Sequence, residues 1–426
     1  MLIETIKRKS YIIIPFLCLT FYLCLLFYVY AFFSVDFINM KIYHPTFKNV
    51  LNNPRDIYMD LEGMFDYYYL PSFACFFSFL GLLDLFTASY IYLIILYISS
   101  LLIILLFDKI LILLNLKNKW IRLLFLLIIS NGWVIFNQFR ELQTKIIVCL
   151  IFLYVIEREI DYRINDKEKK IGYYIINYGL FIFGLGITPN LIFLFVIYLF
   201  HEIRIDTLFK RINIAKYLIV ISIFLIENFL FFIYPELIFK FLNGINFPAQ
   251  YNSILSLCLS PFQISNEFLL NYIRLLLILI TILITILLTV NSKLLIEWKF
   301  SIFCLSLLYL DIYKGYALLQ ILLPFVLLLL VPFIKQEVSI KKFVEENYIM
   351  LIGFLSASCF ILISSDTNHL FRTFTLLQKF PFYLLIYFRW LIVTCLFTTI
   401  LLILIYKNKN HFPYYKDFAN MRDYQN

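Results

Sequence analysis

One acidic side chain in this sequence is placed where it could act as a general base. Asp36 follows the first long apolar run, 11–33, by only a few residues. A carboxylate held near the end of a rigid helix can take a proton from a hydroxyl group that arrives at a membrane surface. The alternative is that Asp36 is a solvated loop residue that only marks the end of the helix.

Three tyrosines in the same polar stretch could bind a sugar. Tyr58, Tyr68 and Tyr69 lie between Asp36 and the next apolar segment. An aromatic ring can stack on a sugar ring, but tyrosines also form the aromatic belt at membrane–water interfaces. Both interpretations stay open from the sequence alone.

Cations and amides lie near the ends of later apolar runs. The cations are Arg140, Lys314 and Arg372, and the amides are Gln138 and Asn252. Without further information, the cations could simply snorkel to the membrane interface, and the amides could cap helix ends.

The composition predicts the kind of protein that must position these residues. Of the 426 residues, 63% are hydrophobic and 15% are charged, against about 25% charged in soluble domains. This excludes a soluble multidomain enzyme and the usual kind of nucleic-acid-binding protein. The eight cysteines lie in apolar runs without metal-ligand spacing. No disulfide framework, metal or cofactor is expected. Asp36 with Asp66 or Glu62 is the alternative, as a metal site.

Apolar runs predict an all-α polytopic membrane bundle. By the criterion of roughly 20 residues per span, there are about twelve spans, several of them short. The runs are 11–33, 86–107, 120–136, 143–157, 172–187, 189–203, 217–234, 264–291, 300–312, 315–333, 346–364 and 381–406.

The distribution of basic residues predicts the orientation. With twelve spans, every cluster of Lys and Arg falls on the cytoplasmic side, as do both termini. The segment 70–84 must then not cross the membrane. The prediction is a single integral membrane domain over 1–426, with an external loop at 34–70 and a cytoplasmic tail at 407–426. The clusters lie at 109–122, 158–170, 204–216, 293–299, 335–342 and 407–409.

The order of short motifs in the first polar loop resembles that of a known family. Asp36-Phe37 is followed by Ile57-Tyr58 and then by Tyr69-Leu70-Pro71. This resembles the first external loop of glycosyltransferase family 87, the polyprenol-phosphate-mannose-dependent type with a GT-C membrane fold. Leu70 stands where the family has the first of two prolines.

Weaker likenesses follow along the chain. Asn137-Gln138-Phe139-Arg140 resembles the family's Gly-Gln-x-Asn turn in its glutamine only. The glycines Gly184 and Gly186 lead to Thr188-Pro189, where the family has Lys-Pro. Later segments, 250–253 and 314–324, agree in position and less in residue type.

The resemblance implies an enzyme of the cell membrane. Asp36 would be the catalytic base of an inverting transfer of a sugar, mannose by family default, from a polyprenyl-phosphate donor to an acceptor hydroxyl. Arg140, Lys314 and Arg372 would bind the donor phosphate. Tyr58, Tyr68, Tyr69, Gln138 and Asn252 would bind the substrates. The expected partners are that donor, a glycolipid or glycan acceptor and membrane lipids, with no nucleic acid and no cofactor.

Two other classes remain open. A lipid-linked glycan flippase or other transporter would share the hydropathy but would have no reason to place an acid directly after the first helix. A polysaccharide polymerase would favour a large late external loop with several arginines. The loop at 235–263 contains no arginine, which argues against a polymerase.

Overall fold

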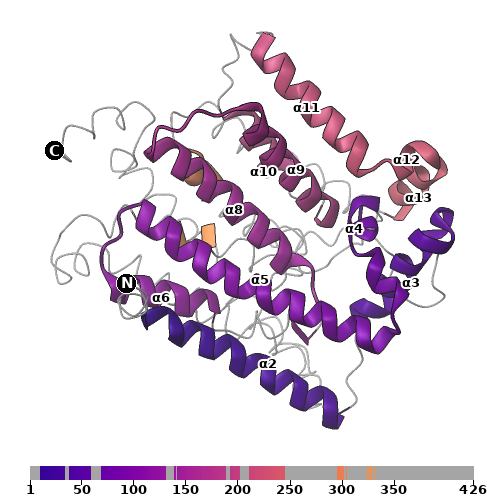
Figure 1. The fold of residues 1–426 in the computed structure, drawn as a ribbon, viewed down its shortest axis with the longest axis horizontal. Coiled ribbons are helices and arrows are strands. Elements are labelled where there is room, and N and C mark those ends of the chain that lie inside the picture. The colour runs from indigo at the N-terminus through magenta and orange to yellow at the C-terminus, as the bar shows by residue number, and fades with distance from the viewer. Residues whose placement is uncertain are drawn as a thin grey trace, which may run out of the picture. The chain divides into compact units, whose positions relative to one another are not determined.

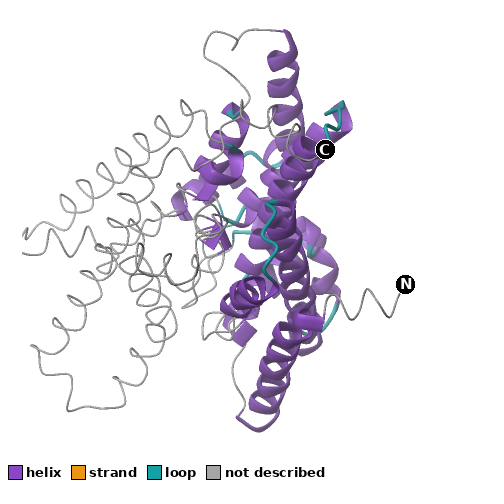
Figure 2. Cartoon of the chain, turned by 90° about the vertical axis from the view of Figure 1, so that its left-hand side faces the viewer, coloured by secondary structure: helices purple, strands orange, loops and turns teal. Residues whose placement is uncertain are grey.

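The computed structural model describes half of the chain. The described residues are 10–33, 38–58, 69–130, 139–140, 142–188, 192–201, 211–244 and 295–301, with positions 304, 324, 325, 327, 328 and 331. All regular elements among them are helices (Figure 2). The prediction of an all-α fold is therefore confirmed for this part of the chain.

The chain divides into two compact units by its internal contacts. The first consists of Met1–Leu113 and Phe136–Pro248, and the second of Leu114–Ile135 and Ala249–Asn426. The second unit includes α6 (Lys119–Ser130) and a ring contact between Phe300 and Phe325. The candidate site lies in the first unit, which is described from here on.

Six apolar helices of the first unit pack against one another (Figure 1). α2 (Ile13–Phe33) contacts α5 (Leu85–Leu113), and α5 contacts α8 (Lys145–Ile164). α8 contacts α9 (Ile171–Ile187), which contacts both α10 (Ile192–Phe200) and α11 (Arg211–Glu227). A 3₁₀ turn, η1 (Ser10–Ile12), precedes α2. These helices correspond to apolar runs of the sequence.

One described helix is long and apolar enough to cross a membrane by itself. α5 has 29 residues, which at 1.5 Å per residue gives roughly 44 Å, against about 30 Å for a bilayer core. The apolar helical stretches Ile13–Tyr28 and Ile171–Ile187 are shorter. The expected number of about twelve spans stays a prediction.

Polar contacts fix the directions of the helices. Tyr11 donates to the carboxylate of Asp108 at 2.8 Å, so α2 and α5 are antiparallel. Lys109 pairs with Glu157 at 2.6 Å near the C-terminal ends of α5 and α8, so these two run in the same direction. We call this end of the unit the Asp108 end. The opposite end, with the N-terminus of α8 and the C-terminus of α9, is called the Tyr69 end.

The segment predicted as an external loop, 34–70, is helical over part of its length. It contains α3 (Ile38–Asn52) and a 3₁₀ turn, η2 (Pro54–Asp56). Met40, Tyr43 and Phe47 recur at helical spacing and are all buried, which is the signal for this helix. Abundant polar residues between them masked that pattern.

The adjoining segment 70–84 does not form a spanning helix. It forms α4 (Pro71–Phe76), of six residues, and the 3₁₀ helix η3 (Ser78–Leu82), of five residues. Both pack on α3. Six helical residues rise only about 9 Å, far less than a bilayer core of about 30 Å. That this segment does not cross stays a prediction.

Charged side chains at the Asp108 end are buried and paired. Glu159 accepts hydrogen bonds from the Tyr198 hydroxyl at 2.6 Å and from the Lys169 ammonium at 2.7 Å. The Tyr198 hydroxyl in turn accepts from the Asn177 amide at 2.8 Å. A buried carboxylate is tolerated only with such partners. The contacts therefore tie α8, α9 and α10 together.

Removing one hydroxyl from this network should destabilise the bundle. In Tyr198→Phe, the Asn177 amide and Glu159 both lose a buried partner, and an unsatisfied buried polar group costs about 1–3 kcal/mol. The apparent melting temperature in detergent should fall by several degrees. Tyr154→Phe, at a tyrosine that is 37% exposed, is the control and should melt like the wild type. Equal melting of the two variants would contradict a structural role for the network.

Candidate functional site

Three of the predicted site residues lie in the described part of the chain. Tyr58 and Tyr69 lie at the Tyr69 end, and Arg140 lies in the turn that leads into α8. Six others are outside the described residues and stay predictions: Asp36, Tyr68, Gln138, Asn252, Lys314 and Arg372.

Tyr58 and Tyr69 come together although residues 59–68 separate them. The Tyr58 hydroxyl donates to the backbone carbonyl of Tyr69 at 2.8 Å. The Tyr69 hydroxyl shares a hydrogen bond with the Tyr43 hydroxyl of α3 at 2.9 Å. Tyr58 and Tyr69 therefore meet directly, and α3 holds the Tyr69 hydroxyl. The sequence did not predict this helix.

Both phenols are held in their neutral form. Burial raises the pKa of Tyr58 well above its ordinary value. Burial also raises the pKa of Tyr69, although the hydrogen bond with the Tyr43 hydroxyl and the nearby Thr144 hydroxyl partly oppose this shift. At physiological pH these hydroxyls can donate and accept hydrogen bonds, but they do not act as phenolate bases.

An aromatic wall supports Tyr69 from α3, α4 and α5. The Tyr69 ring lies 5.5 Å from that of Tyr43 and 5.1 Å from that of Phe73. Phe77 and Tyr92 continue the wall with an edge-to-face contact at 5.4 Å. Such edge-to-face pairs orient rings as well as burying them. The wall gives Tyr69 a fixed position instead of a loose place in an interfacial belt.

Lys145 brings a positive charge to this wall. It is the first residue of α8, and its ammonium donates to the Thr188 hydroxyl at 2.9 Å. The same nitrogen lies 5.6 Å from the centroid of the Tyr69 ring, within the range of a cation–π contact. Lys145 is not among the predicted site residues, because it stands at the start of an apolar run. Its position directly after the turn at 137–142 could have marked it as a candidate cation.

The C-terminus of α9 contacts the start of α4 at very short range. The backbone N–H of Leu70 donates to the carbonyl of Gly186 at 2.8 Å. A Cβ atom on Gly186 would collide with the Ser72 hydroxyl. A larger residue at 186 would therefore force the Ser72 side chain to move. Thr188, two residues later, is the partner of Lys145.

Two buried hydroxyls line this junction. Thr144 is 0% exposed and Ser72 is 5% exposed. Neither oxygen makes a hydrogen bond within the described part of the chain. Thr144 lies near enough to the Tyr69 hydroxyl to lower its pKa, but not in hydrogen-bonding geometry. Buried polar groups without partners are rare and call for an explanation such as a bound ligand or water.

The turn before α8 contains a strained residue. Leu142 has a φ of 52°, in the left-handed region that a bulky side chain rarely adopts. Its N–H bonds to the carbonyl of Phe139 at 3.1 Å, and both side chains are fully buried. Burial thus holds the strained turn in place, and with it the half-buried Arg140. Such strain is concentrated at functional sites.

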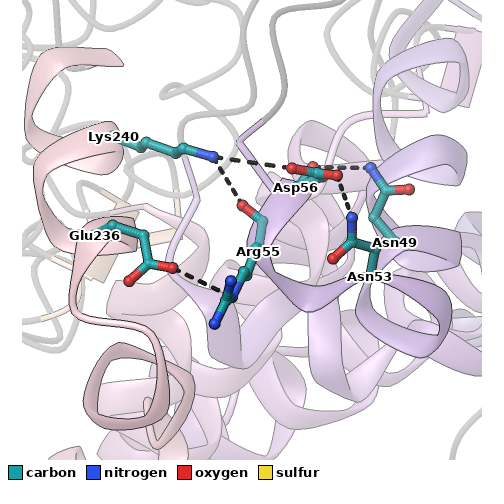
Figure 3. A network of polar contacts seen from close by, with 6 residues as sticks. All are labelled: Asn49, Asn53, Arg55, Asp56, Glu236 and Lys240. Carbon is teal, nitrogen blue, oxygen red and sulfur yellow. Dashed lines mark hydrogen bonds and ion pairs between the residues drawn. The ribbon is translucent and has the colours of Figure 1, made fainter.

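A polar clamp holds the segment that carries Tyr58 (Figure 3). Lys240 of α13 (Glu236–Gly244) donates to the carbonyl of Arg55 at 2.9 Å and lies 4.0 Å from the Asp56 carboxylate. The Arg55 guanidinium lies 3.6 Å from Glu236. Next to the clamp, the Tyr58 ring packs 5.8 Å from that of Phe241. α13 therefore restrains η2 and Tyr58 together. The network consists of Asn49, Asn53, Arg55, Asp56, Glu236 and Lys240.

The described residues at the Tyr69 end offer hydrogen-bonding groups and positive charge, but they do not form a metal site. Within the described ranges, no three His, Cys, Asp or Glu side chains are grouped so that they could hold a metal ion. The alternative metal site of Asp36 with Asp66 or Glu62 lies outside those ranges. What the described residues can do is bind a polar or anionic group between α4, α8 and α9.

Comparisons with known proteins leave the family open. No protein-family model matches the chain, and no curated protein matches it in sequence. The resemblance to glycosyltransferase family 87 therefore rests on the short motifs and on where they lie.

Proposed function

We propose that this protein is a multi-spanning membrane glycosyltransferase. It transfers a sugar, mannose in the first instance, from a polyprenyl-phosphate donor to an acceptor hydroxyl on the outer face of the membrane. Its fold is of the GT-C type with about twelve spans, and both termini are cytoplasmic. The substrates are the lipid-linked donor and a glycolipid or glycan acceptor.

One observation carries this proposal. The segments whose order resembles family 87 are far apart in the sequence but adjacent at the Tyr69 end. Tyr58 bonds to Tyr69, Leu70 bonds to Gly186, and Lys145, just after the turn that contains Arg140, bonds to Thr188. An assembled site is what the motif order would require in an enzyme.

The proposed reaction is a single displacement with inversion. The acceptor oxygen attacks the anomeric carbon, and the bond from that carbon to the phosphate oxygen breaks. The proton of the acceptor hydroxyl passes to the carboxylate of Asp36. The departing polyprenyl phosphate gains negative charge, which cations such as Arg140, Lys314 and Arg372 stabilise. Tyr58, Tyr68, Tyr69, Gln138 and Asn252 hold the sugars.

A donor comparison tests the function. The full chain in nanodiscs is supplied with native lipid extract as acceptor and with radiolabelled mannose on either polyprenyl phosphate or a nucleotide. We expect transfer from the lipid-linked donor only, because that donor reaches the site from within the membrane. Other lipid-phosphate sugars are tested in the same way.

Two results would contradict the proposal. Transfer from the nucleotide sugar alone would place the chain in a different class of enzyme. No transfer from any lipid-phosphate sugar, together with movement of a fluorescent lipid-linked glycan across proteoliposomes, would favour the flippase.

A further inference from the structure

The ammonium of Lys145 is held by a hydroxyl and lies beside an aromatic ring. Its hydrogen bond to Thr188 spans from the first residue of α8 to the residue after α9. The Tyr69 ring lies beside it at 5.6 Å. A lysine ammonium has three donors and favours compact anions such as phosphate. Lys145 therefore has the chemistry and the fixed position of an anion-binding residue.

Thr144 adds a hydroxyl that can donate a hydrogen bond to an anion. It is the N-cap residue of α8, but its hydroxyl does not cap the helix. That hydroxyl is completely buried and makes no hydrogen bond with any described residue. Capping by threonine stabilises a helix by about 1 kcal/mol, so a hydroxyl held away from that role needs another explanation.

The N-terminus of α8 adds a favourable field. The helix has 20 residues, and its dipole places partial positive charge at its first turn. Anions bind readily at such ends because the first N–H groups and the dipole both point toward them. Here the dipole, the Lys145 ammonium and the buried Thr144 hydroxyl all belong to the N-terminal end of α8, and each can favour an anion there.

We propose that Lys145, Thr144 and Thr188 bind the phosphate of the lipid-linked donor. This assignment rests on the proposed function for the identity of the ligand, and it adds a residue beyond Arg140, Lys314 and Arg372. Lys145 is the first residue of α8, and its ammonium donates to Thr188, the residue that follows α9. During transfer it stabilises the charge that develops on the departing phosphate.

A binding experiment without sugar transfer tests the site. The full chain in nanodiscs is titrated with a radiolabelled polyprenyl monophosphate, with the matching polyprenol and, in competition, with inorganic phosphate. Wild type should bind the monophosphate at least tenfold more tightly than the polyprenol. Lys145→Met should lose roughly 10- to 100-fold in affinity for the monophosphate, the usual effect of a lost charge-assisted hydrogen bond. Its affinity for the polyprenol should not change.

Three further variants separate binding from folding. Lys145→Arg keeps the charge and should retain most of the affinity. Thr188→Val removes only the hydroxyl that positions the ammonium and should weaken monophosphate binding several-fold. Lys170→Met, at an exposed lysine before α9, is the matched control and should bind like the wild type. Loss of polyprenol binding in Lys145→Met would indicate misfolding. The monophosphate affinities of Lys145→Arg and Thr188→Val would then decide whether Lys145 binds the phosphate.

The outcomes distinguish this site from the proposed function. Lys145→Met could keep the wild-type ratio of affinities for monophosphate and polyprenol. Lys145 would then not bind the phosphate, even if the protein transfers sugar. If Lys145→Met loses that preference but no donor supports transfer, the phosphate site stands and the glycosyltransferase fails. Inorganic phosphate that competes at the same concentration as the lipid monophosphate would identify a free phosphate as the ligand and overturn the lipid-linked donor.

Discussion

Replacement of Asp36 by asparagine is expected to lower the turnover number for sugar transfer by about 100- to 10,000-fold. The amide keeps the size of the side chain but cannot accept the proton of the attacking hydroxyl. Affinity for the proposed lipid-linked donor should change little, because the proposal assigns the donor phosphate to cations instead. The measurement is initial transfer from polyprenyl-phosphate mannose in nanodiscs, at matched protein levels, with kcat and KM determined separately.

Two matched variants make the Asp36 result specific. Asp36→Glu retains a carboxylate and should keep far more activity than Asp36→Asn. Asp166→Asn makes the same chemical change at an exposed residue with a φ of 49°, a conformation that asparagine tolerates well. It should transfer sugar at the wild-type rate. Equal rates in wild type and Asp36→Asn would remove Asp36 from the role of base while leaving the enzyme assignment in place.

The second large effect is expected from alanine at position 81. Gly81 lies in η3, and a Cβ atom there would come 2.5 Å from the backbone nitrogen of Lys48 and 2.7 Å from the carbonyl carbon of Phe47. Both are backbone atoms of α3, so the clash cannot be relieved by rotating a side chain. Overpacking typically costs about 1–3 kcal/mol, and occasionally more. Gly81→Ala should therefore lower the apparent melting temperature by many degrees.

The consequence for activity follows from what α3 carries. Tyr43 of α3 holds the Tyr69 hydroxyl, and Phe47 belongs to the same aromatic wall. If η3 moves away from α3, the Tyr69 end loses its support, so sugar transfer should fall together with stability. Gly172→Ala is the control, because no atom lies within 4 Å of a Cβ there. A Gly81→Ala protein as stable and active as Gly172→Ala would show that η3 does not pack on α3 in this way.

The sequence by itself determined the fold class and most of the helices. Hydropathy is a local property, so the runs at 86–107 and 172–187 predicted α5 and α9 to within a few residues, except for the C-terminal extension of α5 to Leu113. It failed for α3, where Lys41, His44 and Lys48 hid the apolar spacing of Met40, Tyr43 and Phe47. A short amphipathic helix has the composition of a loop, and only its periodicity distinguishes it.

Only the tertiary structure decided which site residues lie together. The pairing of Lys145 with Thr188 joins the start of α8 to the end of α9, and no spacing along the chain indicates it. The same holds for Gly186, whose missing side chain matters only because Ser72 lies against it. The left-handed Leu142 likewise exists because burial compensates its strain. Such contacts depend on how antiparallel helices align, which is set by packing over their whole length and not by the few residues that meet.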